Sequence, residues 1–354
     1  MKRPTPDEAP KGITTADDLV KALKQDPKLA DGAGLRRANA TDDAVQTIPT
    51  GIDTLDGVTG RGGVPRSRMI VFSGKEGGGK TTAALCAVAA FQKRGGLALY
   101  IDAERKLDFD WAAKNGVKVD DLIVSHPIHL ERAFMTAEDA VKKTDPAVPL
   151  LIVLDSVNAG LTKDQMESGY EDQPAYGPQS RVFSAAIPKL IPHLERSGAT
   201  FLLISQIREK MNAGTTIAGG NAVRFYSVLI VVFEQFGKVT ASGKKMSELR
   251  KLYAGRVIPD SEGSIIGADF SIKTVKNQLA PPFRDSVMRI SFVRGVDRVW
   301  CTLRRAEEMA LVERSGAWYS FGAERIGQGA DGCCVALRKN KELLAAIRKA
   351  VRAS

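Results

Sequence analysis

Residues 74–81 form a glycine-rich stretch whose spacing suits the phosphates of a nucleotide. They read Gly-Lys-Glu-Gly-Gly-Gly-Lys-Thr and fit the pattern G-x-x-x-x-G-K-[ST]. Backbone N–H groups of such a turn point at the phosphates, Lys80 would neutralise their charge, and the Thr81 hydroxyl would bind Mg²⁺. The stretch alone does not separate a kinase, a switch and a motor. The expected nucleotide contacts are Gly74, Lys75, Glu76, Gly77, Gly78, Gly79, Lys80, Thr81 and Thr82.

Polar residues close three apolar runs further along the chain. Asp155 ends "LLIVLDS", where a carboxylate can hold the Mg²⁺ shell. Glu104 in "LYIDAERK" could activate a water as general base, and Asp102 competes for that role. Gln206 in "LLISQIR" could sense the terminal phosphate. Each could also be an ordinary strand-end residue, but a phosphate loop upstream favours the metal-binding interpretation for Asp155.

The elements that must position these residues are short apolar runs that alternate with helical stretches. Nearly continuous hydrophobic runs are typical of parallel strands buried on both faces, and the helices between them complete βαβ units. This pattern predicts a doubly wound α/β domain. Pro188 and Pro192 predict a kink or a break in one helix. The runs are "RMIVFSG", "GLALYIDA", "PLLIVLDS" and "ATFLLISQ".

The remaining segments do not follow this α/β pattern. Residues 15–27 predict a short helix that begins near Thr15 and stops at Pro27. After about residue 235 the pattern becomes antiparallel, and residues 239–265 predict a basic surface insertion. Residues 298–354 predict a small separate unit with helical ends.

Composition limits the possible classes of protein. The chain has 354 residues and a formal net charge of +10, which favours a polyanionic partner without establishing one. No apolar run approaches the roughly 18 residues that a membrane span needs, and residues 1–18 lack the apolar segment of a signal peptide. The four cysteines form no C-x-x-C pair, so we expect reduced thiols in a cytoplasmic protein.

In their order along the chain, these motifs resemble those of the bacterial and phage RecA-type DNA recombinases. The resemblance covers about residues 46–330, and its last motif separates the chain from helicases and circadian-type ATPases that share the core strands. It implies a RecA-like P-loop ATPase core with a mostly parallel sheet and helices on both faces. The motifs are "GKEGGGKTT", "YIDAERKLD", "LIVLDSV", "SQIREKM", "GGNAVRFY", "VKNQLAPPF" and "GAWYSFGAERIGQG".

The resemblance also implies a division into three parts and a role for single residues. Residues 1–45 would pack onto a neighbouring protomer, residues 46–297 would be the ATPase core, and residues 298–354 a small α+β C-terminal domain. The nucleotide would be ATP. Glu104 takes the position of the catalytic glutamate and Gln206 that of the glutamine that couples ATP to DNA, while Asp108 and Trp111 would hold the adenine.

Two loops would carry DNA by the same resemblance. The first spans about residues 164–180 and the second about residues 208–221. Small residues and glycines suit loops that order on their ligand, although a plain mobile loop would have the same composition. Single- and double-stranded DNA are the implied partners. The residues expected to contact DNA are Tyr176, Arg181, Ser184, Arg208, Lys210, Met211, Gly219, Gly220 and Asn221.

Several positions depart from the family pattern. Two lysines usually reach into the neighbouring subunit's ATP site; Lys276 matches one, and Gln278 stands at the other. A cation supplied across an interface stabilises transition-state charge, so this change puts the ATPase rate in question. The second DNA loop is a few residues shorter than usual, residues 239–265 have no counterpart, and a basic end replaces the family's acidic tail.

The sequence therefore predicts a DNA-dependent ATPase that forms helical filaments on single-stranded DNA and promotes homologous pairing and strand exchange. Its catalytic residues would be Glu104, Lys80, Gln206 and Lys276, with ATP and Mg²⁺ as cofactors and Thr81 and Asp155 at the metal. Two alternatives stay open. One is a regulatory paralogue that binds ATP and DNA but hydrolyses weakly, and the other is a hexameric translocase or helicase on the same core.

Overall fold

A computed structural model describes residue 13 and residues 15–25, 45–169, 177–210, 214–243, 246–253 and 257–353. The chain divides into two units, Met1–Val45 and Gln46–Ser354. In the first unit, α1 (Ala16–Gln25) is an amphipathic helix that buries none of its residues. The Thr15 hydroxyl accepts the backbone N–H of Asp18 at 3.1 Å, so the helix begins at the residue that the sequence suggested.

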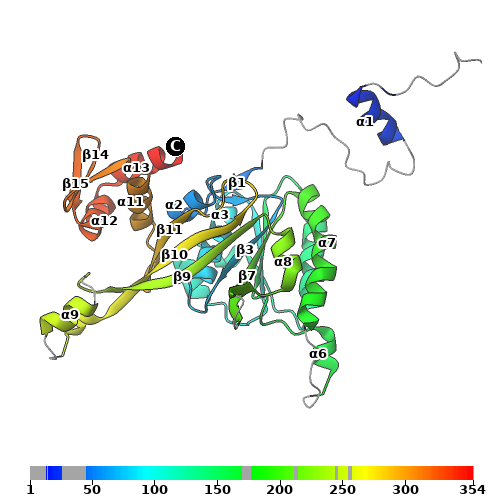
Figure 1. The fold of residues 1–354 in the computed structure, drawn as a ribbon, viewed down its shortest axis with the longest axis horizontal. Helices are drawn as coiled ribbons and strands as arrows, with labels where there is room; N and C mark the ends of the chain where they lie inside the picture. The colour runs from blue at the N-terminus through cyan, green and yellow to red at the C-terminus, as the bar shows by residue number, and fades with distance from the viewer. Residues whose placement is uncertain are drawn as a thin grey trace, which may run out of the picture. The chain divides into compact units, whose positions relative to one another are not determined.

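A large twisted sheet forms the centre of the second unit (Figure 1). Strands β9, β3, β7, β6, β4 and β5 run parallel in that order, and β10, β11 and β12 extend the sheet beyond β9 as antiparallel strands. The predicted parallel α/β core with an antiparallel extension is confirmed. The strands are β3 (Met69–Gly74), β4 (Leu97–Asp102), β5 (Leu122–Ser125), β6 (Leu150–Asp155), β7 (Thr200–Lys210), β8 (Gly214–Ile217), β9 (Leu229–Thr240), β10 (Ile265–Asn277), β11 (Asp285–Ser291) and β12 (Gly295–Val296).

Helices cover both faces of this sheet. Alternate side chains of β3 show why, because Ile70 and Phe72 enter one hydrophobic cluster while Met69 and Val71 enter the other. The first cluster includes α3 (Lys80–Lys93) and α2 (Asp53–Val58), and the second includes α5 (Leu130–Lys143) and α7 (Pro178–Ser197). Shorter elements are β1 (Thr47–Ile48), β2 (Val64–Pro65), α4 (Phe109–Lys114), α6 (Lys163–Glu167) and α8 (Gly220–Tyr226).

Helix α7 is not broken by its two prolines. It runs without interruption from Pro178 to Ser197, with Pro188 and Pro192 inside. Each proline removes one backbone hydrogen bond, yet the helix buries a stripe of apolar side chains against the sheet, which offsets that loss. Of the predicted kink or break, the break is therefore wrong. The buried apolar side chains of this stripe are Phe183, Ile187, Leu190 and Leu194.

One segment expected as a loop contains strands. β7 continues past Gln206 to Lys210, and β8 pairs with it antiparallel, so the second predicted DNA loop is partly a hairpin and Gln206 is not a strand end. Further along the chain, β9 and β10 form a long pair from Leu229↔Asn277 to Thr240↔Ile265, and the predicted surface insertion of residues 239–265 begins and ends at the far end of this pair. The chain between them carries α9 (Met246–Tyr253) and α10 (Asp260–Gly263).

The last part of the chain packs three helices around a small antiparallel sheet. α11 (Arg298–Glu308) contacts α12 (Ala330–Lys339) and α13 (Lys341–Ala353), and β13 (Val312–Ser315), β14 (Trp318–Phe321) and β15 (Glu324–Gln328) form the sheet. The guanidinium of Arg289 on β11 makes two hydrogen bonds to Asp269 and one to Asp331, which ties this part to the large sheet. Within the described ranges, every helix is too short or too polar to cross a membrane.

Candidate nucleotide site and DNA-facing elements

The phosphate loop joins β3 to α3 and folds closely around its own lysine. Gly74 has a φ of 154°, and a Cβ there would lie 2.1 Å from the carbonyl oxygen of Phe233, so only glycine fits. The Nζ atom of Lys80 donates to the carbonyl oxygens of Gly74 at 3.0 Å and Lys75 at 2.6 Å. Burial lowers the pKa of Lys80, while nearby carboxylates raise it. The loop can therefore present a partly desolvated cation to an anionic ligand.

Asp155 lies at the carboxyl end of β6 and faces the first turn of α3. Its Oδ2 atom accepts hydrogen bonds from the Tyr100 hydroxyl at 2.6 Å and from the Thr81 hydroxyl at 2.9 Å. Burial raises the pKa of Asp155, and these two hydrogen bonds lower it. A carboxylate and a hydroxyl oxygen in contact are the hard oxygen donors that Mg²⁺ prefers.

Glu104 follows β4 by two residues and shares this edge of the sheet. The Asp102 carboxylate accepts the backbone N–H groups of Lys106 at 3.3 Å and Leu107 at 3.0 Å, so it shapes the turn after the strand. The Glu104 carboxylate accepts a hydrogen bond from the Ser156 hydroxyl and lies 3.5 Å from the Lys106 ammonium. Of the two competing carboxylates, Glu104 is the one not engaged by backbone N–H groups of the turn.

Trp111 and Asp108 lie beside the helix that starts at the phosphate loop. The Asp108 carboxylate caps α4 by accepting the backbone N–H of Trp111 at 2.9 Å. The indole Nε1 of Trp111 donates to the hydroxyl of Thr82 at 3.0 Å, and its ring is half-buried. A fixed aromatic face next to α3 suits a nucleotide base.

Gln206 connects the nucleotide edge to the start of α8 through its backbone. It pairs with Gly74 in the parallel register, and its N–H donates to the Asn158 side-chain oxygen at 3.0 Å. Its carbonyl accepts the N–H of Ala218 at 3.4 Å, one residue before Gly219. Gly219 has a φ of 96°, and a Cβ there would lie 2.5 Å from a Val223 methyl group, so the residue that precedes α8 must be glycine.

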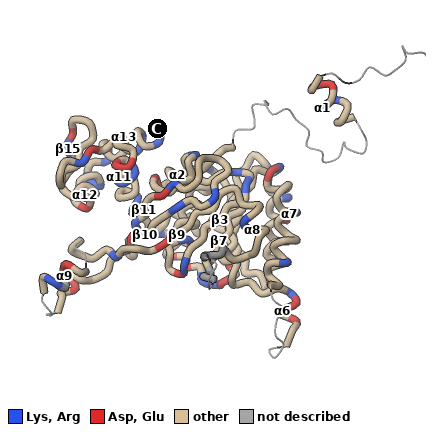
Figure 2. Tube along the Cα trace, in the orientation of Figure 1, with Lys and Arg blue, Asp and Glu red and all other residues tan. Residues whose placement is uncertain are grey.

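The structure brings the start of α8 against α7. A Cβ on Gly220 would lie 3.0 Å from the Ser180 hydroxyl oxygen, so the two helices approach closely there. Arg181 and Ser184 are exposed one turn apart on α7, and Asn221 is exposed in the first turn of α8. Lys and Arg recur along α7 (Figure 2). These polar groups share one helix pair and can meet one ligand.

Four of the residues expected to contact DNA are only partly described or not described. The backbones of Arg208 and Lys210 lie in β7, where they pair with Thr216 and Gly214. Tyr176 and Met211 lie outside the described residues. The two predicted loops are therefore represented by the described elements within or next to them, which are α6 and α7 for the first and β7, β8 and α8 for the second.

Lys276, expected to act across a subunit interface, contacts α8 within this chain. Its Nζ atom donates to the carbonyl oxygens of Arg224 at 2.9 Å and Phe225 at 2.8 Å, the last turn of α8. Burial and then the charge of Arg224 lower the pKa of Lys276. A cation at a helix C-terminus is favourable, so Lys276 stabilises the helix that follows the second DNA loop. Gln278 is exposed.

Sequence reasoning missed the residues that orient the predicted site residues. Tyr100, Ser156 and Asn158 respectively contact Asp155, Glu104 and the backbone of Gln206. Tyr100 sits in an apolar run and resembles a core residue. Ser156 and Asn158 come within three residues after the run that ends at Asp155, and their place beside this predicted site residue is the sequence feature that could have identified them.

The sheet order, the phosphate loop and the carboxylates beside it define a P-loop nucleotide-binding protein of the α/β class. Profiles of two families match the chain, the RecA N-terminal domain at residues 17–297 and the RecA C-terminal domain at residues 301–354. Protein RecA of Syntrophus aciditrophicus is 39% identical over 312 residues, which is 87% of this chain and 84% of that protein. Protein RecA of Xylella fastidiosa strain M12 is 37% identical over 341 residues, 94% and 91% of the two chains. Protein RecA of Aquifex pyrophilus is 36% identical over 312 residues, 87% and 83%.

The chain therefore belongs to the RecA family. The resemblance found in the motifs and the fold class it implied are both confirmed. Membership makes this a protein of DNA recombination and repair that binds ATP and DNA.

Proposed function

We propose that the protein is a DNA-dependent ATPase that polymerises on single-stranded DNA into helical filaments and catalyses homologous pairing and strand exchange. The observation that carries this proposal is the backbone connection through Gln206. The Gln206 backbone N–H donates to the side chain of Asn158, just after the strand that ends at Asp155. The Gln206 carbonyl oxygen accepts the N–H of Ala218, just before α8. This connection would transmit a change at the nucleotide edge to the elements that would hold DNA.

The nucleotide and metal roles rest on donors that fit them. The oxygens of Thr81 and Asp155 lie 2.9 Å apart and would hold Mg²⁺ together with phosphate oxygens. Bound Mg²⁺ supplies positive charge against the phosphates. The described residues offer no cluster of three or more His, Cys, Asp or Glu side chains suited to a metal, and such a cluster is not needed when the substrate supplies ligands.

Each side chain has a distinct proposed task in hydrolysis. Lys80 neutralises the terminal phosphates, and Glu104, oriented by Ser156, accepts a proton from the attacking water. Gln206 senses the terminal phosphate. The Lys276 side chain on β10 exchanges its contacts with α8 for the ATP site of a neighbouring subunit. ATP binding and subunit contact thereby become interdependent. Asp108 and Trp111 hold the adenine.

DNA contact and chain organisation complete the proposal. Arg181, Ser184 and Asn221 are exposed on the α7–α8 pair and would meet the DNA backbone, together with the predicted residues of the two loops. The partners are single- and double-stranded DNA and further copies of the chain, in the cytoplasm. Residues 1–45 would pack on a neighbour, 46–297 form the ATPase core, and 298–354 form the C-terminal domain.

ATP hydrolysis with and without single-stranded DNA tests the central claim. The wild type should hydrolyse ATP faster when DNA is present and should exchange strands, whereas Lys80→Ala should lose ATP-dependent exchange. Full exchange by Lys80→Ala would refute the assignment of the loop.

A second candidate is a regulatory DNA-binding member that hydrolyses ATP weakly, and Gln278 favours it because a second cation is missing. Absence of DNA stimulation would select this candidate over the recombinase. A hexameric translocase is the third possibility. Electron microscopy with a slowly hydrolysed ATP analogue distinguishes it, since closed rings instead of helical filaments would overturn the filament proposal.

A further inference from the structure

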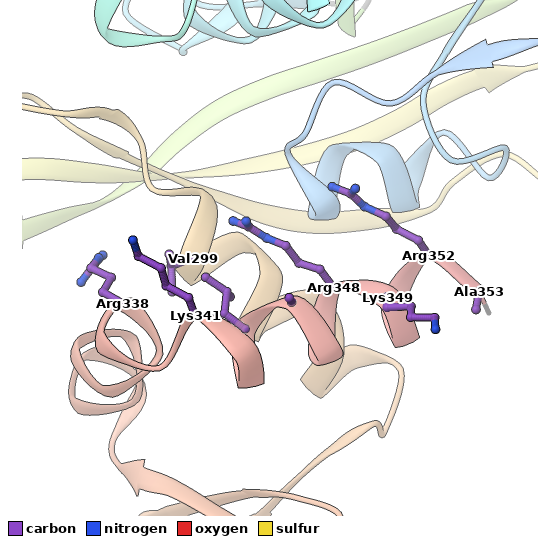
Figure 3. Close-up of a pocket in the computed structure, with 9 residues that line it drawn as sticks. Val299, Arg338, Lys341, Arg348, Lys349, Arg352 and Ala353 are labelled. Carbon is purple, nitrogen blue, oxygen red and sulfur yellow. The ribbon is translucent and has the colours of Figure 1, made fainter.

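A groove of about 850 Å³ follows α13 along its contact with α11 and α12. Five cationic side chains line it, which are Arg338, Lys341, Arg348, Lys349 and Arg352. In Figure 3, four of them extend toward the same side of the helices, and Lys349 points away from the other four. The nucleotide site and the α7–α8 pair contribute no residue to this groove, so it is a separate feature of the molecule.

The cationic charge of the groove is only partly neutralised. Asp297 pairs with Arg338 at 2.5 Å, and the buried Asp53 pairs with Arg352 at 3.3 Å. Lys341 and Lys349 make no ion pair with any carboxylate in the described part of the chain. An excess of positive charge therefore remains along the rim, and a ligand with negative charge would relieve it.

Arg348 lies among several other charged side chains. Its Nε atom donates to the Thr302 hydroxyl at 3.2 Å, and the same hydroxyl donates to Asp53 at 2.6 Å. Burial lowers the pKa of Arg348, and the charges of Arg352 and Arg298 lower it further, although Asp53 raises it. The guanidiniums are thus fixed by the fold before any ligand arrives, which reduces the entropy lost on binding.

The floor of the groove is apolar. Val299 from α11 and Leu344 and Ala345 from α13 lie between the cations. The cationic positions from Lys341 to Arg352 span about 16 Å along α13 at roughly 1.5 Å per residue. An extended peptide covers that distance with about five residues at roughly 3.3 Å each. The groove therefore has the size and the two-sided chemistry of a peptide site.

We propose that this groove binds an extended acidic segment of a partner protein, one that carries aliphatic or aromatic side chains between its carboxylates. The carboxylates would pair with Lys341, Arg348 and Arg352, and the apolar side chains would cover Leu344 and Ala345. A nucleic acid backbone offers phosphates to the rim but no side chain for the apolar floor. This chemistry favours a peptide over DNA.

Fluorescence anisotropy with a labelled peptide of alternating aspartate and leucine tests the proposal on the full-length protein. Two control peptides separate the contributions, one with asparagine for aspartate and one with glycine for leucine. Both should bind at least about tenfold more weakly, because one lacks the charges and the other lacks the apolar contacts.

Two pairs of variants locate the site while keeping net charge matched. Ala345→Asp puts a carboxylate in the groove and should weaken binding at least about tenfold, whereas Ala346→Asp, also exposed on α13 but outside the groove, should not. Lys341→Gln should weaken binding about fivefold, and Lys339→Gln, exposed on α12, should leave it unchanged. Thermal unfolding of each variant verifies that the fold persists.

Equal binding by the aspartate and asparagine peptides would overturn the proposal, as would equal effects of the two variants in each pair. A duplex oligonucleotide provides the competing outcome. If the duplex binding is weakened by Ala345→Asp and the peptide binding is not, the groove serves DNA and the peptide proposal is wrong.

Discussion

The indole of Trp111 donates a 3.0 Å hydrogen bond to the hydroxyl of Thr82, two residues after the lysine of the phosphate loop. The backbone of Trp111 is fixed as well, since its N–H donates to the Asp108 carboxylate at 2.9 Å and its carbonyl oxygen accepts a hydrogen bond from the Asn115 side-chain amide at 2.9 Å. The ring is therefore held in a set position relative to the start of α3. This contact links the proposed base-binding residue directly to the helix that would bind the phosphates.

Trp111→Phe should raise the KM for ATP about fivefold and change kcat by less than about twofold. Phenylalanine keeps an aromatic face but cannot donate to Thr82, and one neutral hydrogen bond is worth about 1 kcal/mol. Steady-state ATP hydrolysis separates the two constants. Thr82→Val removes the same bond from the other side, so the double variant should be no weaker than either single one. A loss confined to kcat would refute a positioning role for Trp111.

Asp155→Asn should lower kcat for ATP hydrolysis by about 100-fold, because an amide is a poor ligand for Mg²⁺ where a carboxylate is proposed to hold it. Nucleotide binding measured without Mg²⁺ should persist. An equal rate in the variant and the wild type would remove Asp155 from the metal site.

Tyr100→Phe should shift the acid limb of the ATPase pH profile to higher pH. Burial already raises the pKa of Asp155, and the hydrogen bond from Tyr100 counteracts that rise. Without the Tyr100 hydroxyl, the pKa of Asp155 in the folded protein rises further. Asp155 is therefore protonated, and hydrolysis lost, at a higher pH when the pH is lowered. The rate at alkaline pH should change little. A shift to lower pH would contradict the role assigned to this hydrogen bond.

Gln278→Lys should raise DNA-stimulated ATP hydrolysis at least about tenfold and leave hydrolysis without DNA unchanged. The new ammonium would add charge at a neighbour's site, which exists only between assembled subunits. Lys276→Met should lower the stimulated rate by about 1000-fold. Lys273→Met on the same strand is the control, since Lys273 is an exposed lysine of β10. Equal losses in both methionine variants would count against Lys276.

Residue patterns predicted the parts of the fold that depend on local chemistry. The apolar runs that end at Gly74 and Asp155 became buried parallel strands because only a strand covered on both faces tolerates that composition. The uninterrupted α7 could not be predicted, since burial of Phe183 and Ile187 outweighs the proline signal only in the folded context. The extension of β7 past Gln206 likewise depends on a pairing partner, β8.

The sequence predicted the main side chains of the candidate site but not the residues that contact and orient them. Thr81 and Asp155 follow from motif spacing, whereas their contact and the Tyr100 hydroxyl depend on which strands are neighbours. The contact of Lys276 with α8 is equally non-local, because it joins β10 to a helix 51 residues away in sequence. The roles of these residues stay predictions until the variants are measured.

Asp56 should make the stability of the protein decrease as pH rises toward neutrality. This aspartate accepts hydrogen bonds from the Thr50 N–H and hydroxyl, each at 2.8 Å, and from the Gly51 N–H at 3.1 Å, yet burial raises its pKa from 3.8 to about 7. Between these two values the folded state binds more protons than the unfolded state. The free energy of unfolding should therefore fall with rising pH in that window, by up to about 1.4 kcal/mol per pH unit.

Asp56→Asn isolates this contribution from that of other titrating groups. Asparagine keeps one side-chain oxygen for Thr50 and cannot ionise, although it loses the acceptor for Gly51 and should lower stability at acid pH. Urea unfolding of both proteins from pH 4.5 to pH 8 gives the comparison. The stability of the wild type relative to the variant should fall steadily as the pH rises to about 7 and then stay constant, since Asp56 is ionised in both states above that pH. A difference that is independent of pH would show that Asp56 is ionised throughout in the folded protein.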